Sequence, residues 1–340
     1  MKEISVLGID LAKNIFQLHG SDRNGNAVLR KKLSRKQLVL FVANLPKCTI
    51  AMEACGGSHF WGRKFSEMGH ETKLISPQFV KPFVKSNKND AHDAEAIVEA
   101  ALRPNMRFVA VKTIAQQDEL CLHRVRERLI GSRTALINEI RGLLHEYGVV
   151  IPKGAQNIRA QLPEIIELSD KQVSDQARQL FTNLYEELCH CDENVGLYEK
   201  KINAQAKTSA SCQKIMKIPG VGPLTATAIV ATVGNANLFK NGRQMSAWLG
   251  LVPRQNSSGG KTQLLGISKR GDSYVRKLLI HGARSVLLTI EKSTKEDQKT
   301  RWLKQLLERR GYNRACVALA NKNARVIWKL LATDEVYRVA

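Results

Sequence analysis

The chain has 340 residues, of which 43% are hydrophobic and 25% are charged, with a formal net charge of +22. These are globular proportions and exclude a disordered tail protein. No run of about 18 apolar residues occurs, so no membrane-spanning helix is expected. The opening MKEISVLGID lacks the apolar core of a signal peptide, and the seven cysteines have no regular spacing. We therefore expect a cytoplasmic protein without a disulfide framework.

The positive charge is concentrated in the last 130 residues. Residues 211–340 hold 23 basic and 7 acidic side chains, a net charge of +16, whereas residues 111–210 hold 13 and 14. Such an excess repels itself unless a polyanion neutralises it, so the expected partner is nucleic acid. The basic residues do not line one amphipathic helix, which argues against a membrane-surface role.

Residues 1–112 predict a layered α/β domain. The expected strands cover Ile4–Asp10, Ile15–Gly20, Ala27–Leu33, Cys48–Glu53, Glu71–Ile75 and a short segment in Arg107–Lys112. The expected helices cover Ser34–Leu45, with Ser34 as the N-cap, His59–Met68 and Asp90–Leu102. Pro77–Asn89 is basic and predicted to be irregular. This order of strands and helices is typical of an α/β fold.

The rest of the chain predicts mainly helices. Residues 113–210 indicate a helical coiled-coil region, with one helix over Thr113–Tyr147 and a second stretch, about Leu162–Ala210, returning antiparallel to it. Residues 211–340 indicate a mostly α domain. Its expected parts are the IPGVG loop at Ile218–Gly222, a helix over Pro223–Val233, a helix around Gly242–Leu249, a polar loop over Val252–Gly266, and helices to the end.

Four acidic residues stand out by position. Asp10 and Glu53 each end a predicted strand, and Asp90 and Asp93 lie three residues apart at the start of a predicted helix. Acids at neighbouring strand ends can converge on one edge of a sheet, and a cluster of carboxylates requires cations between its members. Oxygen ligands select Mg²⁺, with Mn²⁺ as the alternative. The bland alternative is that these acids are turn residues and helix-dipole partners.

The motifs GID, MEA and DAHDA, with IPGVG, AWLGLVPRQNSSGGK and ISKRGDSYVRKLL in the C-terminal part, resemble transposases of the insertion-sequence 110 and 1111 group. These are bridge-RNA-guided DNA recombinases. The resemblance implies a RuvC-like (ribonuclease H-like) N-terminal domain whose DEDD tetrad is Asp10, Glu53, Asp90 and Asp93 and binds metal. It also implies donor and target DNA, a guide RNA, and a homo-oligomer, a dimer or tetramer, in which the serine of one protomer meets the acids of another.

The same resemblance implies a serine nucleophile in a short loop that follows an LxPR segment and precedes glycine. Ser258, directly before Gly259, matches this place best, and Ser257 stays open as the alternative. Residues alone indicate only a flexible Ser-Ser-Gly-Gly loop.

Several residues of the C-terminal part are candidate contacts to nucleic acid. IPGVG followed by a helix resembles a helix-hairpin-helix element, in which Gly220 and Gly222 let the backbone approach a phosphate. The alternative is an ordinary helix end, with Pro223 in the first turn of the next helix. Basic residues flanking the serine loop are candidate clamps on the phosphate backbone, namely Lys261, Lys269, Arg270, Arg276 and Lys277.

The leading hypothesis is thus an Mg²⁺-dependent, RNA-guided DNA transposase that associates with the nucleoid when it acts. One alternative is a hydrolytic RuvC-like nuclease that uses the same four acids and a water molecule. The other is a non-catalytic nucleic-acid-binding protein whose acids are caps and turn residues.

Overall fold

The computed structural model describes residues 3–85, 90–167, 173–290, 294 and 297–338, and for Asp90 and Ala91 it describes the backbone only. The chain divides into two compact units, Met1–Ala115 and Gln116–Ala340. We call them the N-terminal and C-terminal units and describe each by itself. The further division predicted at residue 210 stays a prediction, because the helices on both sides of it belong to one unit.

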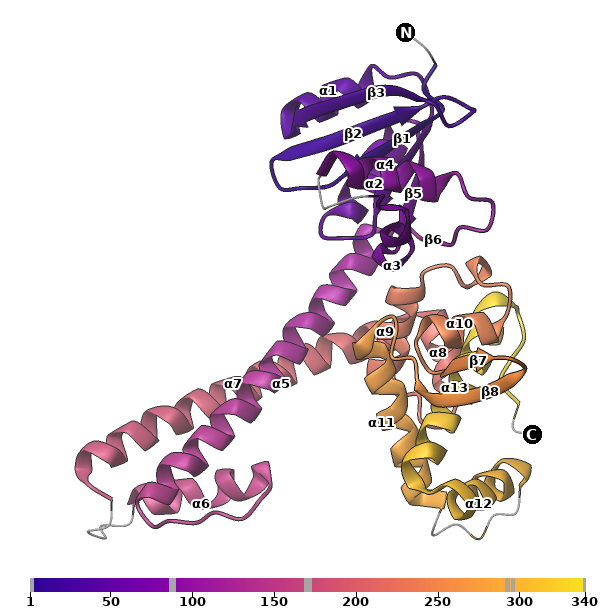
Figure 1. The fold of residues 1–340 in the computed structure, drawn as a ribbon. Helices are drawn as coiled ribbons and strands as arrows, with labels where there is room; N and C mark the ends of the chain where they lie inside the picture. The colour runs from indigo at the N-terminus through magenta and orange to yellow at the C-terminus, as the bar shows by residue number, and fades with distance from the viewer. Residues whose placement is uncertain (1–2, 86–89, 168–172, 291–293, 295–296, 339–340) are drawn as a thin grey trace. The chain divides into compact units, whose positions relative to one another are not determined.

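The N-terminal unit is built on a mixed sheet. Its strands are β1 (Val6–Asp10), β2 (Ile15–Ser21), β3 (Ala27–Ser34), β4 (Thr49–Glu53), β5 (Glu71–Ile75) and β6 (Phe108–Val109). Their order in the sheet is β3-β2-β1-β4-β5-β6. Figure 1 shows β3, β2 and β1 side by side. β1, β4 and β5 run parallel, whereas β2, β3 and β6 pair antiparallel to their neighbours. The predicted α/β layering is confirmed.

Helices cover both faces of this sheet. The helices of the unit are α1 (Arg35–Ala43), α2 (Ser58–Glu67), α3 (Pro77–Val80), the 3₁₀ turn η1 (Lys81–Phe83) and α4 (Asp90–Ala101). One core joins the sheet to α1 and α2 through residues such as Leu38, Trp61 and Phe65. A second core joins the other face to α4, through Ile97 and Val98 among others. The unit therefore has three layers.

Local signals explain where these helices begin. The Ser34 hydroxyl accepts a hydrogen bond from the Gln37 backbone, and the Gln37 side chain accepts one from the Ser34 N–H, which makes a capping box. The prediction of Ser34 as the N-cap is therefore confirmed. The prediction that all of Pro77–Asn89 is irregular was wrong for α3 and η1, where Pro77 and Pro82 begin short turns. Residues 86–89 lie outside the described part.

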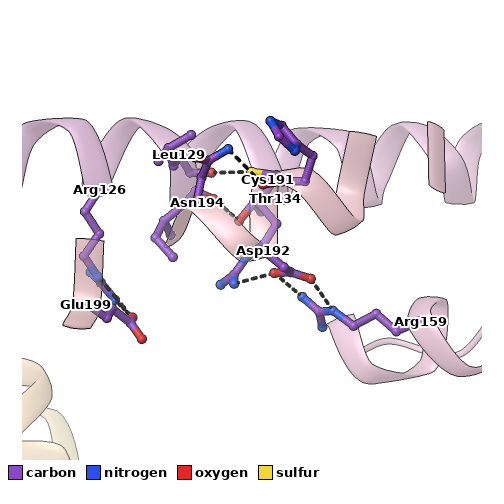
Figure 2. Close-up of polar contacts among 11 residues, drawn as sticks. Arg126, Leu129, Thr134, Arg159, Cys191, Asp192, Asn194 and Glu199 are labelled. Carbon is purple, nitrogen blue, oxygen red and sulfur yellow. Dashed lines mark hydrogen bonds and ion pairs between the residues drawn. The ribbon is translucent and has the colours of Figure 1, made fainter. Parts of the chain in front are cut away.

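The C-terminal unit begins with an antiparallel helix pair. α5 (Ile114–Glu146) is followed by α6 (Ala155–Glu167) and α7 (Asp175–Thr208). Arg126 of α5 is paired with Glu199 of α7, and seven residues further along α5, Arg133 is paired with Asp192, seven residues earlier in α7. Figure 2 shows the pair of Arg126 and Glu199, and the two pairs together set the antiparallel register. The predicted antiparallel return is confirmed, although it is divided between two helices.

Polar contacts tie the three helices together. Asp192 also accepts hydrogen bonds from the Arg159 guanidinium of α6, at 2.6 and 2.8 Å (Figure 2). Partial desolvation raises the pKa of Asp192, but the guanidinium groups of Arg159 and Arg133 together outweigh it. The pKa of Asp192 is therefore lowered. The thiol of Cys191 donates to the Leu129 carbonyl of α5. Apolar residues around Ile140 and Leu144 form the core beneath these contacts.

A helical bundle completes the unit. It contains α8 (Ala210–Met216), α9 (Pro223–Val233), the 3₁₀ turn η2 (Ala236–Leu238), α10 (Gly242–Trp248), α11 (Ser273–Ile290), α12 (Gln298–Arg310) and α13 (Tyr312–Ala332). A single core of residues from these helices holds them together. Among the described helices, none is long and apolar enough to cross a membrane. The mostly α prediction is confirmed, with one exception.

The exception is Val252–Gly266. The prediction of a polar loop for this segment was wrong. The segment forms a hairpin of β7 (Pro253–Ser258) and β8 (Lys261–Ile267). Gly259 and Gly260 connect the strands with φ values of +55° and +77°, the backbone of a tight two-residue hairpin turn. The mainly polar, solvent-exposed residues show no apolar alternation, so the strand signal in the sequence is weak.

Candidate active site

Asp10 and Glu53 lie together at one edge of the N-terminal sheet. Each is the last residue of its strand, and β1 and β4 are parallel neighbours with Ile9 opposite Met52. Side chains alternate along a strand, so Asp10 points to the same face as Gly8, and Glu53 to the same face as Ala51. Ala51 belongs to the core beneath α4. Both carboxylates therefore lie on the face that α4 covers.

Gly8 allows α4 to approach this edge closely. A Cβ atom on Gly8 would lie 2.5 Å from the Ala94 carbonyl oxygen and 2.6 Å from a methyl carbon of Val98. Any larger side chain would therefore displace the helix. Gly8 and Asp10 are two residues apart and point to the same face of the sheet. The contact of Gly8 with Ala94 therefore brings the part of α4 that carries Asp93 near the acidic edge.

The direction of α4 decides which of its ends lies at that edge. A methyl carbon of Leu102, just past the last residue of the helix, lies 3.6 Å from where a Cβ of Gly25 would stand. Gly25 belongs to the β2–β3 turn, next to the start of β1, where Val6 pairs with Ser21. The end of α4 thus lies near the start of β1, so its first turn, with Asp90 and Asp93, lies toward Asp10.

The Cys55 thiol, directly after β4, lies within reach of the charges of both carboxylates. The pKa of the Cys55 thiol is raised first by desolvation, and then by the negative charges of Glu53 and Asp10. Both acids are therefore close enough to act on one group directly after β4.

Among the four acids, the side chains of Asp10, Glu53 and Asp93 are described, and these three do not gather into a group that could hold a metal ion. Asp93 is partly buried on α4, whereas the side chain of Asp90 lies outside the described residues. Among the described side chains, no three His, Cys, Asp or Glu residues gather in a way that could hold a metal ion. The structure thus brings Asp10 and Glu53 together beside the first turn of α4, and the metal-binding tetrad stays a prediction.

The two candidate serines differ in their surroundings, although both are exposed on β7. The Ser257 hydroxyl accepts a hydrogen bond from the Gln255 amide at 2.7 Å and faces Thr262 at 3.5 Å. Within the described residues, the Ser258 hydroxyl has no hydrogen-bond partner. As neighbours in a strand, the two point to opposite faces of the hairpin. Ser258 is therefore the hydroxyl that a substrate can reach without breaking an internal bond.

The base of the hairpin is anchored firmly. The Ser268 N–H donates to the Val252 carbonyl at 2.8 Å. A Cβ on Gly250 would lie 2.1 Å from the Arg270 carbonyl oxygen, so the backbone segments after α10 and before α11 pack directly on each other. Lys269 adopts a left-handed φ of +54° in this tight passage. The exposed ribbon thus projects from a rigid base.

The predicted basic contacts fall into two groups. Lys261, Lys269 and Arg270 are exposed. The Arg276 guanidinium instead donates to the carbonyls of Leu249 and Arg270, both at 3.1 Å, and Lys277 is ion-paired with Glu127 of α5. The first group is free to meet phosphate, whereas the second also holds the unit together.

The two predicted glycines of IPGVG also differ. Gly220 has a φ of +86°, and its Cβ would lie 2.6 Å from the Gly282 carbonyl oxygen of α11. Its role in the fold is therefore close packing of this turn on α11. Gly222 is the N-cap of α9 and has open space around the position of a Cβ.

Comparison with known proteins finds transposase matches both in the region of the acids and in the region of the serines. The transposase IS116/IS110/IS902 family profile matches residues 212–299, and a profile described as a transposase matches residues 7–149. The chain is 52% identical, over 99% of its length and 92% of the relative, to the transposase for insertion sequence element IS1111A of Coxiella burnetii. The chain belongs to the IS116/IS110/IS902 family of transposases. Transposases act on DNA, which they cut and rejoin.

Other relatives extend this likeness over the full transposase. A probable family 20 transposase of Pseudomonas aeruginosa is 47% identical over 98% of this chain and 99% of its own. The transposase for insertion sequence element IS1328 of Yersinia enterocolitica is 40% identical over 99% of both. The family assignment predicted from the motifs is confirmed. The match over residues 7–149 contains all four acids, and the match over residues 212–299 contains both serines.

One group of residues in this transposase was missed by sequence reasoning. A cavity of about 970 Å³ lies between α10, α12, α13 and the segment after α13. It is lined by Lys299, Lys322 and Lys329 among others. The available signal was the basic run NKNARVIWK in α13, which periodicity alone does not separate from a solvated helix face.

Proposed function

We propose that this transposase breaks and rejoins DNA strands through the Ser258 hydroxyl, with divalent cations held by Asp10, Glu53, Asp90 and Asp93 and with an RNA guide selecting the sites. The observation that carries the proposal is the pairing of Asp10 and Glu53 at the ends of parallel neighbouring strands, on the face that α4 covers. A RuvC-like fold for the N-terminal unit is part of the same proposal, supported by its three antiparallel strands followed by β4 and β5.

The residues at this edge suit a hard divalent cation. Two carboxylates converge there, and the first turn of α4 brings Asp93 toward them. All the candidate ligand atoms are carboxylate oxygens, which Mg²⁺ and Mn²⁺ prefer. When bound, the metal would neutralise charge on phosphate oxygens and favour an ionised hydroxyl. The chain's own contribution is to hold the carboxylates on rigid elements, where their spacing does not drift.

Ser258 supplies the covalent chemistry. Its oxygen attacks a DNA phosphorus, the bond from phosphorus to a strand oxygen breaks, and the serine proton ends on that departing hydroxyl. A DNA hydroxyl then attacks the phosphoserine ester, and the proton returns to Ser258. One phosphate ester bond forms for each one that breaks, so the strand is rejoined without ATP.

The C-terminal unit supplies the contacts to nucleic acid. The net charge of +16 in residues 211–340 and the exposed side chains of Lys261, Lys269 and Arg270 support binding to phosphate backbones. Such contacts position a strand and do not read its sequence. We propose that base pairing with the guide RNA supplies sequence choice, and that a dimer or tetramer brings the serine of one protomer to the acids of another.

The experiment that tests the nucleophile compares Ser258→Ala with Ser257→Ala, using labelled DNA that carries the insertion-sequence ends, the co-purified RNA and Mg²⁺. A denaturing gel resolves the covalent protein–DNA adduct. We expect Ser258→Ala to abolish adduct and recombinant product, because no hydroxyl attacks, and Ser257→Ala to retain both. Normal recombination by Ser258→Ala would refute the assignment.

The same gel distinguishes the hydrolytic alternative. Free 5′-phosphate ends without any adduct in the unmodified protein would indicate a nuclease that uses water. For the guide, RNA that co-purifies with the protein is sequenced and compared with the DNA that flanks the gene. Absence of RNA complementary to the insertion-sequence ends or the target would refute RNA guidance.

A further inference from the structure

The cavity missed by sequence reasoning is a basic site inside the C-terminal unit. Six basic residues line its volume of about 970 Å³, namely Arg243, Lys299, Lys322, Arg325, Lys329 and Arg338, against two acidic ones, Asp334 and Glu335. It is formed entirely within one compact unit. Its volume lies at the upper end of the range for ligand pockets.

The walls of the cavity are held rigidly. A Cβ on Gly242, at the start of α10, would lie 2.8 Å from the Arg325 carbonyl oxygen of α13, so the two helices meet backbone to backbone. The Trp328 indole N–H donates to the carbonyls of Ala236 and Phe239, which fixes this aromatic lining residue in place. A preformed cavity binds its ligand without first paying to order its walls.

Two lysines in the cavity repel each other. Lys299 of α12 and Lys322 of α13 are both only partly exposed. The pKa of Lys299 is lowered first by desolvation and then by the charge of Lys322, against the opposing effect of Asp297. Like charges on a desolvated wall cost stability in the free protein, and an anion between them removes that cost.

Part of the cavity is already contacted by a carboxylate of this chain. Glu335, in the segment after α13, is ion-paired with Lys329 at 2.7 Å. The same segment supplies Tyr337, an aromatic residue that lines the cavity together with Trp328. Basic side chains beside aromatic ones are the combination that binds single-stranded nucleic acid through phosphate contact and base stacking.

We infer that this cavity binds a single-stranded nucleotide segment, with a phosphate between Lys299 and Lys322 and a base beside Trp328 and Tyr337, and that Glu335 competes for Lys329. The site needs neither Ser258 nor the acidic edge of the N-terminal unit. It can therefore be tested with metal removed, and failure of the proposed strand chemistry leaves it unaffected.

The test measures binding of full-length protein to fluorescein-labelled oligo(dT) and oligo(U) 12-mers in EDTA, by anisotropy over a range of salt concentrations. The variant is the double substitution Lys299→Gln and Lys322→Gln, and the matched control is Lys304→Gln, exposed on α12 and absent from the cavity lining. We expect the double variant to bind the preferred oligomer roughly tenfold more weakly and the magnitude of the salt slope to fall by roughly 1. The control should stay within about twofold of the unmodified protein.

Two further readouts separate binding from a structural role. Thermal unfolding of the double variant should occur at about the same temperature, because the substitutions remove both the repulsion between the lysines and the contact of the Lys322 ammonium with the Trp302 ring. Glu335→Gln should tighten binding by roughly twofold to fivefold, because Lys329 is released from an exposed ion pair. Preference for oligo(dT) assigns the site to a DNA strand, and preference for oligo(U) assigns it to RNA. Unchanged affinity and salt slope in the double variant, or weakening accompanied by a lower unfolding temperature, would overturn the inference.

Discussion

The acidic edge of the N-terminal unit and the serine hairpin of the C-terminal unit solve opposite problems. Asp10 and Glu53 end buried strands, and their positions are set by sheet register and by the contact of Gly8 with α4. Ser258 lies on a ribbon whose residues from Pro253 to Gly266 are all exposed and that has no core of its own. In the function we propose, groups that share a cation need constant spacing, whereas a nucleophile that meets a DNA strand needs access. Rigid packing serves the first and exposure the second.

The largest expected effect comes from breaking the packing at the acidic edge. Gly8→Val places side-chain atoms where the Ala94 carbonyl and Val98 now lie, so α4 must move away from β1. We expect the free energy of unfolding to fall by about 3 kcal/mol and strand cleavage by about 100-fold. Chemical denaturation and the adduct gel measure these losses. Gly131→Ala, in α5 with open space around it, is the control and should lower neither the free energy of unfolding nor strand cleavage. Full activity of Gly8→Val would show that the close approach is unimportant.

A second prediction concerns a buried histidine of the C-terminal unit, His123. His123 of α5 is 1% exposed and contacts Thr227 of α9 at 2.9 Å and Tyr274 of α11 at 3.0 Å. The Thr227 hydroxyl donates to the Pro223 carbonyl at 2.8 Å, so it accepts from the Nε2–H of His123, and Tyr274 donates to Nδ1. Burial, and then the charge of Arg126, lowers the pKa of His123 from 6.5 to about 4. The imidazole is therefore neutral in the folded protein.

Between pH 6.5 and 4 the unfolded chain binds a proton at this histidine that the folded chain does not. The contribution of neutral His123 to stability is thus fully present above pH 6.5 and is lost as the pH falls toward 4, by on the order of 3 kcal/mol. His123→Gln should remove this part of the pH dependence, as measured by denaturation at pH 7 and at pH 5. His190→Gln changes an exposed histidine of α7 and serves as the control. A pH profile identical in His123→Gln and the unmodified protein would contradict the neutral assignment.

The smallest expected effect on stability comes from the hairpin turn. Gly260 has a φ of +77°, so Gly260→Ala strains the turn by about 1 kcal/mol, whereas Gly260→Asn tolerates this backbone better. Because the ribbon lies outside the cores, we expect the global free energy of unfolding to change by less than about 0.5 kcal/mol. Adduct formation should fall more in Gly260→Ala than in Gly260→Asn. Equal adduct yields from the two variants would show that turn geometry does not position Ser258.

How far the sequence predicted the molecule depended on how strong each local signal was. The strand over Glu71–Ile75 and the helix over Pro223–Val233 were predicted with the bounds that the structure has, because apolar patterns and flanking turn residues mark them. The hairpin was missed because its residues are mainly polar on both faces, and its Gly-Gly turn was the remaining signal. For Arg276 and Lys277, partners distant in sequence were decisive, and no local pattern reveals them.

By itself, the sequence determined the family, the order of the main helices and of the strands in the N-terminal unit, and the charge asymmetry, because each of these is carried by short motifs or by composition. The tertiary structure alone decided that Gly8 admits α4 to the acidic edge, that Gly220 packs on α11, and that Lys299 and Lys322 face one cavity. The physical reason is that close packing and the electrostatic effect of one charge on another depend on distances between residues far apart in the chain, which no local pattern encodes.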